Sequence, residues 1–148
     1  MRRCILSTLS VALPAGCQHI RKELVPAAAY TASAQTSKFQ VDSYSNFDIH
    51  LSVTAVSGTS PTMNVYVQKL LPDDSTWQDM ASFAQVTATA AHRLSFISAG
   101  SSIAAVQTEA LAAGSTVTTP VGGWMRLRWV IAGTSPSFTM EINGDFFA

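Results

Sequence analysis

Apolar and polar residues alternate along much of this chain, which is the pattern of β-strands that bury one face. The clearest run starts at Asn46, and its apolar side consists of Phe47, Ile49, Leu51, Val53 and Ala55. Successive side chains of a strand point to opposite faces of a sheet, so this period of two predicts a half-buried strand. A second run predicts the strand that follows, with apolar positions at Met63, Val65 and Val67.

Shorter apolar runs predict the remaining strands, and turn-forming residues separate them. The runs are FAQVTA at 83–88, HRLSFIS at 92–98, WMRLRWVI at 124–131 and SFTMEI at 137–142. The segment LPDDSTW at 71–77 contains the proline and aspartates that favour a turn. One stretch has a helical pattern instead: Ser102 is a suitable cap for a short helix near 102–113, which Gly114 would end.

A short turn sequence occurs twice, as SGTSP at 57–61 and as AGTSP at 132–136. Its glycine tolerates a positive φ, its hydroxyl side chains bond the turn backbone, and its proline opens the outgoing strand. Because both copies lie between apolar runs, we expect each to close a β-hairpin. The expected fold is all-β, an antiparallel β-sandwich of the jelly-roll or immunoglobulin-like type over 28–148, after an extended arm over 1–27.

Charge is scarce in this chain and unevenly placed. Only 12% of the 148 residues are charged, about half of the usual ~25%. Residues 1–27 carry a net charge of +3, because Arg2, Arg3, Arg21 and Lys22 outnumber Glu23. Residues 28–148 carry −3, from five basic and eight acidic side chains. A surface with so little charge opposes association weakly, and a basic arm is suited to docking on an acidic surface.

The two cysteines, Cys4 and Cys17, both lie in the arm, so no disulfide framework holds the body together. An apolar stretch that ends in small residues before Cys17 leaves a lipoprotein signal as an alternative, although Pro14 departs from that pattern. No run approaches the ~20 apolar residues of a membrane-spanning helix, and we expect no membrane segment.

Patterns of catalytic chemistry are absent from the sequence, and we expect neither enzymatic activity nor a cofactor. The histidines, His19, His50 and His92, are not at metal-ligand spacing. Asp73, Asp74 and Asp79 have the oxygen ligands that calcium prefers, but consecutive aspartates before Ser-Thr-Trp favour a turn, so no metal is expected. No nucleophile elbow or glycine-rich phosphate loop is present.

Two surface hypotheses follow from aromatic and basic residues. A core role is expected for the three tryptophans, Trp77, Trp124 and Trp129. The alternative is a sugar-stacking platform that they form with Tyr66, which we expect to be exposed on its strand. Arg126 and Arg128 share one face of a strand. One interpretation is that they contact an acidic partner surface together with the arm's basic residues, and the alternative is a solvated face. The negative charge of the body argues against direct nucleic-acid binding.

Two long segments resemble small structural proteins of tailed-bacteriophage virions. They are YTASAQTSKFQVDSYSNFDIHLSVTAVSGTSPTMNVYVQKLLPDDSTWQDMASF at 30–83 and WMRLRWVIAGTSPSFTMEI at 124–142. Their order is that of the family: a small-residue entry strand, a long alternating strand, a Gly-Thr-Ser-Pro turn, an Asp…Ser-Thr-Trp turn, and an Arg-rich strand before a second Gly-Thr-Ser-Pro turn. The resemblance covers roughly four-fifths of the chain.

This resemblance implies a non-catalytic β-sandwich that decorates or cements a capsid. The implied partners are the major capsid protein and neighbouring copies of this chain, which suggests a homo-oligomer. The implied location is the virion, on the capsid surface, after assembly in the host cytoplasm. A neck, tail or head-spike component is the alternative within that class, and a carbohydrate-binding module or lipoprotein is the alternative outside it.

Overall fold

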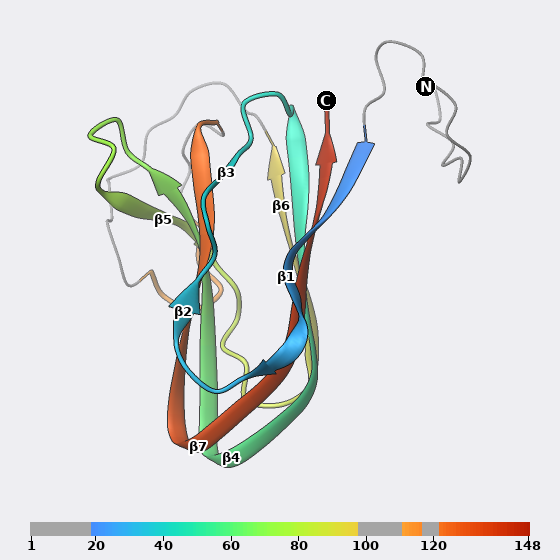
Figure 1. Cartoon of the computed structure of the whole chain (residues 1–148), viewed down its shortest axis with the longest axis vertical. Coiled ribbons are helices and arrows are strands. Elements are labelled where there is room, and N and C mark those ends of the chain that lie inside the picture. The colour runs from blue at the N-terminus through green and yellow to red at the C-terminus, as the bar shows by residue number, and fades with distance from the viewer. Residues whose placement is uncertain (1–18, 98–110, 117–121) are drawn as a thin grey trace.

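The computed structural model describes residues 19–97, 111–116 and 122–148. Its seven strands are β1 His19–Tyr30, β2 Ala34–Gln35, β3 Phe39–Gln40, β4 Asn46–Leu70, β5 Trp77–Ser82, β6 Ala90–Ile97 and β7 Trp124–Phe147 (Figure 1). The described part of the chain is thus all-β, as predicted, and includes no helix that could cross a membrane. The predicted helix near 102–113 lies outside the described residues as far as 110, and 111–113 form coil and turn.

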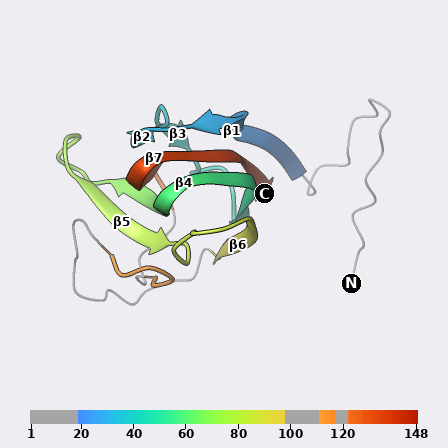
Figure 2. The same ribbon diagram turned by 90° about the horizontal axis from the view of Figure 1, so that it is seen from below.

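Two exceptionally long strands, β4 and β7, form the centre of the fold. They pair antiparallel along their whole length, from Asn46 opposite Phe147 to Lys69 opposite Met125. This two-stranded ribbon is folded over at its middle, at residues 57–62 of β4 and 132–137 of β7 (Figure 1). In the view from below, β4 and β7 lie side by side across the bend (Figure 2).

The bent ribbon supplies the two middle strands of each of two facing layers. In the first, the β1 layer, the order is β1, the second half of β7, the first half of β4, and β6. In the second, the β5 layer, the order is β2 with β3, the first half of β7, the second half of β4, and β5. Two antiparallel four-stranded layers wound from nested ribbons make a β-sandwich of the jelly-roll type, one of the two types expected.

The repeated turn does not close two hairpins, and that prediction is wrong. The two copies instead face each other across the ladder, with Ser57 opposite Ser137 and Thr59 opposite Thr134. Each copy bends the strand that contains it, β4 or β7. The two strands bend together and stay paired with each other. Hairpins were expected because alternation and turn chemistry are local, whereas the choice of pairing partner depends on the whole chain.

The two bends have almost the same backbone geometry. Gly58 and Gly133 have φ values of 111° and 124°, and Ser60 and Ser135 both have a φ of 49°. A Cβ on Gly58 would lie 2.7 Å from the carbonyl oxygen of Ser135, and one on Gly133 would lie 2.9 Å from that of Ser60. Glycine is therefore required twice over, for its positive φ and for the close approach of the partner backbone.

The predicted alternation places the core correctly, except near the bend. The inward residues from both layers are buried: Phe47, Ile49, Leu51, Val53, Met63, Val65, Val67, Met125, Leu127, Trp129, Phe138, Met140 and Ile142. Ala55 is exposed, contrary to the prediction, because the register of β4 shifts after Val53 and Val56 packs against the core in its place.

Two other expectations differ from the structure. The segment FAQVTA forms no strand, because only Val86 makes an isolated bridge, to Met63; HRLSFIS does lie in strand β6 as far as Ile97. Strand β1 runs through residue 27, which was the expected end of the arm. Val25 is 1% exposed and pairs with Ile142, so the sheet extends back to His19.

We expect Gly58→Ala to destabilise the fold more than Gly123→Ala. Both glycines have a positive φ, which costs alanine about 1–2 kcal/mol, but a Cβ on Gly123 would meet no atom within 4 Å. At Gly58 the clash with the backbone of 134–136 should add roughly 1–3 kcal/mol. Urea unfolding of both variants measures the difference, and equal losses would contradict the close contact of the two bends.

Candidate functional site

The candidate interaction residues do not form one basic surface. Arg21 and Lys22 lie on β1, whereas Arg126 and Arg128 lie on the first half of β7, in the opposite layer. Arg2 and Arg3 lie outside the described residues. The alternation that put two arginines on one strand face was correct, but the sandwich separates that face from β1.

Arg21 is engaged by an acidic residue of its own sheet. Its Nε donates to Asp145 Oδ1 at 2.9 Å, and the Nε2 atoms of His19 and His50 lie 3.5 and 3.6 Å from the two oxygens of the same carboxylate. The hydrogen bond from Arg21 lowers the pKa of Asp145, against the effect of burial. This cluster connects β1 to β7 and β4, so the structure gives Arg21 a role in holding the edge strand.

Arg126 takes part in a hydrogen-bonded network that is mostly buried. Its Nε donates to Gln68 Oε1 at 2.7 Å, and Gln68 Nε2 donates to Asp79 Oδ1 at 2.7 Å. The other oxygen of Asp79 accepts the backbone N–H of Leu111 at 3.0 Å. The Arg126 guanidinium also lies 4.2 Å from the ring centroid of Trp77. Buried polar groups that satisfy one another in this way hold segments together, and here the network holds residue 111 against β5.

The aspartates considered as calcium ligands have different structural roles. Asp79 is fully buried within the Gln68 network. Asp73 closes the turn after β4, where it accepts the N–H of Ser75 at 3.1 Å and that of Thr76 at 2.9 Å. In the described ranges, no three histidine, cysteine or acidic residues are grouped as metal ligands.

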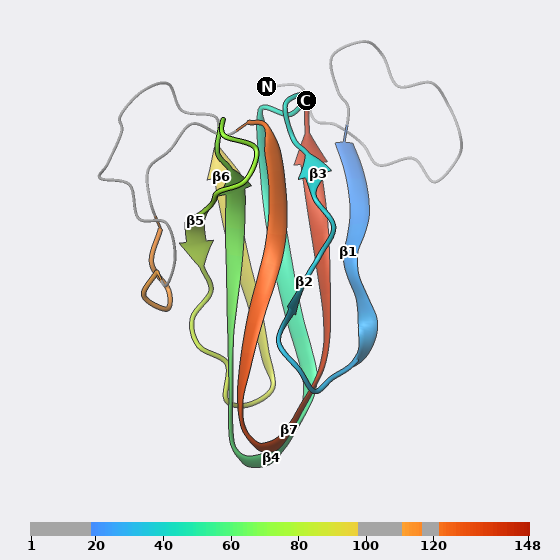
Figure 3. The same ribbon diagram turned by 60° about the vertical axis from the view of Figure 1, so that its left-hand side comes forward.

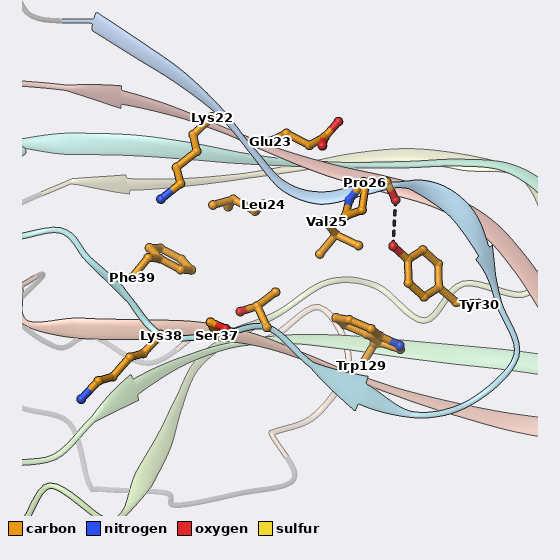
Figure 4. A pocket seen from close by; sticks show the side chains of 11 residues that line it. Lys22, Glu23, Leu24, Val25, Pro26, Tyr30, Ser37, Lys38, Phe39 and Trp129 are labelled. Atoms are coloured by element: carbon orange, nitrogen blue, oxygen red, sulfur yellow. Dashed lines mark hydrogen bonds between the residues drawn. The ribbon is translucent and has the colours of Figure 1, made fainter.

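A groove of about 320 Å³ opens between β1 and the β2–β3 segment (Figure 4). Its aromatic wall is held by the protein's own contacts: Trp129 Nε1 donates to Ala32 O at 3.1 Å, and the Tyr30 hydroxyl donates to Pro26 O at 2.8 Å. Burial raises the pKa of Tyr30, and the charge of Glu23 adds to this effect. The aromatic groups are thus engaged in packing the open side of the sandwich.

A second cavity, of about 470 Å³, lies at the loop end of the sandwich, the end opposite the two bends. The β4–β5 turn, the chain before β4 and the start of β7 all reach this end (Figure 3). Its polar lining consists of Asp42, Lys69, Asp74 and Gln78, beside the ring of Trp124. We refer to it as the loop-end cavity.

Asp42 is the best-fixed side chain of the loop-end cavity. Its Oδ2 accepts from Gln40 Nε2 at 2.6 Å, and its Oδ1 accepts the backbone N–H of Gly123. The hydrogen bond from Gln40, followed by that from Gly123, lowers the pKa of Asp42. No local signal in the sequence indicated this bond, because Asp42 and Gly123 are 81 positions apart.

The four aromatic residues considered as a sugar platform do not come together. Trp129 is 5% exposed and belongs to the core, as expected, and Tyr66 and Trp77 are half-buried on the β5 layer. Trp124 is 37% exposed and lines the loop-end cavity, with the Lys38 ammonium 4.7 Å from its ring centroid. A single exposed tryptophan therefore remains from the predicted set.

Comparison with known proteins identifies no family for this chain. No family model matches it, and no curated protein matches it. Among solved structures, a chain in the "Structure of infectious bursal disease virus Gx strain" is 14% identical, with a TM-score of 0.48. The match covers 99% of this chain, which spans about a third (36%) of the length of the viral chain.

We expect Thr76→Val to raise the pKa of Asp73, the residue that closes the β4–β5 turn. Hydrogen bonds, chiefly from the Thr76 hydroxyl, lower that pKa to about 2. A depressed carboxyl pKa stabilises the fold above the unfolded value of 3.8, and this stabilisation is lost as the pH falls toward 2.

The measurement is a carboxyl-carbon NMR titration of Asp73 in both proteins. Ser75→Ala is the matched control, because the Ser75 hydroxyl contributes least to the shift and its backbone N–H remains. A pKa that moves as far in Ser75→Ala as in Thr76→Val would show that the threonine hydroxyl is not the main cause.

Proposed function

We propose that this chain is a structural protein of a tailed-bacteriophage virion that decorates the capsid and stabilises the shell through protein–protein contacts. The supporting observation is that the two segments resembling such proteins supply both strands of the central ribbon, including both bends. The part of the sequence that carries the resemblance is thus the part that makes the fold. Jelly rolls of this type recur in viral capsid proteins, although lectins and cupins also use them.

The mechanism we propose is burial of surface area. Each copy would bury about 1,200–2,000 Å² against the major capsid protein and neighbouring copies, the usual range for a stable interface. The low charged fraction of 12% keeps the desolvation cost of such contacts small. Many copies on one shell would add avidity, because each contact rebinds at a high effective concentration.

The basic N-terminal arm is the anchor in this proposal, with Arg2 and Arg3 as its first charges. It leads into β1, which the Asp145 cluster and the pairing with β7 hold to the body. A force on the arm would therefore be transmitted to the sheet, because β1 is held to β7. A neck, tail or head-spike position would use the same arm and fold, on a different acidic surface.

The arm is tested by removing residues 1–18 and measuring co-sedimentation with purified shells. The deletion stops at 18 because a cut at 27 would also remove most of β1 and with it Val25 of the core. We expect the full chain to bind at a fixed ratio to the major shell protein and the shortened chain to lose at least about tenfold in affinity.

Arg93→Gln in the full-length chain is the control, because Arg93 is an exposed arginine on β6, at the edge of the β1 layer away from the arm. Its loss removes one positive charge and should leave shell binding nearly unchanged. Unimpaired binding of the shortened chain would contradict the anchoring role of the arm. A full-length chain that is absent from purified particles would contradict the virion assignment itself.

A further inference from the structure

We propose that the loop-end cavity is a binding site for a neutral saccharide, with Trp124 as its stacking surface. The cavity is an open depression bordered by the β4–β5 turn, by Asp42 before β4, and by Gly122 to Trp124 at the start of β7. Its volume of about 470 Å³ lies within the range of roughly 300–1,000 Å³ typical of ligand sites. The proposal is independent of the virion assignment, because it concerns the isolated chain.

The exposure of Trp124 is unusual for this protein. Among the described residues, only Trp124 and Ile20 are large apolar side chains with more than a third of their surface exposed. The Lys38 ammonium lies over the ring, 4.7 Å from its centroid, and Trp124 also lines the cavity. A tryptophan ring held beside a polar cavity presents a flat apolar surface with a polar edge. The C–H face of a pyranose ring is complementary to such a surface.

The polar lining matches the hydroxyl groups of a sugar. Each sugar hydroxyl both donates and accepts, so a site for it needs acceptors and donors close together. Asp42 and Asp74 supply carboxylate acceptors, Lys69 supplies an ammonium donor, and the Gln78 amide supplies both kinds of group. The loop-end cavity differs from the groove of Figure 4 in the exposure of its tryptophan, because the tryptophan of that groove is buried.

The walls of the site are ordered before any ligand arrives. Asp42 is fixed by Gln40 and by the backbone of Gly123. In the β4–β5 turn, Leu71 N donates to Thr76 O at 2.8 Å, and Asp74 N donates to Leu71 O at 3.0 Å. A preformed site loses less conformational entropy on binding, which favours even the modest contacts that a sugar makes.

The charges of the lining favour a neutral or amino sugar over an acidic one. The lining carries two carboxylates, Asp42 and Asp74, and one ammonium, that of Lys69, while a second ammonium, that of Lys38, lies over the Trp124 ring outside the lining. The low pKa of Asp42 keeps its carboxylate ionised. A uronic or sialic acid would bring a third negative charge beside these two, and like charges at close range are repulsive. The carboxylates of the lining therefore disfavour an acidic sugar.

The test is titration of the purified full-length chain with neutral oligosaccharides of glucose, galactose, mannose and N-acetylglucosamine, and with oligogalacturonate as the acidic counterpart. Binding is followed by isothermal titration and by the NMR signal of the Trp124 indole N–H. We expect at least one neutral oligosaccharide to bind in about the millimolar range or tighter, and oligogalacturonate to bind at least about tenfold more weakly.

Matched variants locate the site. Trp124→Ala should weaken binding at least about tenfold, whereas Ile20→Ala, which removes the other exposed apolar side chain, should leave it unchanged. Asp74→Asn should weaken binding several-fold without disturbing the fold, because asparagine tolerates the φ of 55° at this position.

The proposal is overturned if no neutral saccharide of the panel binds, if oligogalacturonate binds best, or if Trp124→Ala and Asp74→Asn both bind like the unchanged chain. Loss of shell binding in the arm deletion has no bearing on these titrations. The two proposals therefore succeed or fail separately.

Discussion

The rest of this structure depends on one contact, that between the two Gly-Thr-Ser-Pro bends at which the paired β4–β7 ribbon folds over. Each glycine accommodates the backbone of the other bend where any side chain would collide with it. Strands β4 and β7 remain paired on both sides of the bends, so these two strands form the middle of both layers. The core forms between the two halves of the bent ribbon. Every other strand pairs with an edge of the ribbon.

The same bend decides where the polar chemistry of the molecule lies. It sends the end of β4 and the start of β7 to one end of the sandwich, where the β4–β5 turn and Asp42 meet Trp124. It also places the arginines of β7 on the layer opposite β1. One of them, Arg126, donates a hydrogen bond to Gln68 there. The residues expected to form one basic surface are therefore divided between the edge strand β1 and the opposite layer, where Arg126 belongs to the Gln68 network.

The two proposed roles use opposite properties of this fold. Binding to a shell needs area with little charge and a connection that bears load, and β1 with its Asp145 cluster provides the connection. Recognition of a saccharide needs a small ordered set of polar groups around one aromatic ring, and rigid turns at the loop end provide it. Neither role requires the buried core to move, because both draw on edges and loops that the sandwich holds in place.

The sequence by itself determined which residues face the core, because a strand's period of two is a local property of the chain. The alternate apolar residues from Phe47 to Val53 and from Phe138 to Ile142 are buried, as this period predicts. It also determined the turn at Asp73, whose bonds join residues three apart at most. Only the tertiary structure decided that the two Gly-Thr-Ser-Pro copies pair with each other and that Asp42 bonds Gly123. It alone decided that Trp124 stays exposed while Trp129 is buried. These outcomes depend on pairing between segments far apart in the chain, and local propensity has no access to the free energy of such contacts.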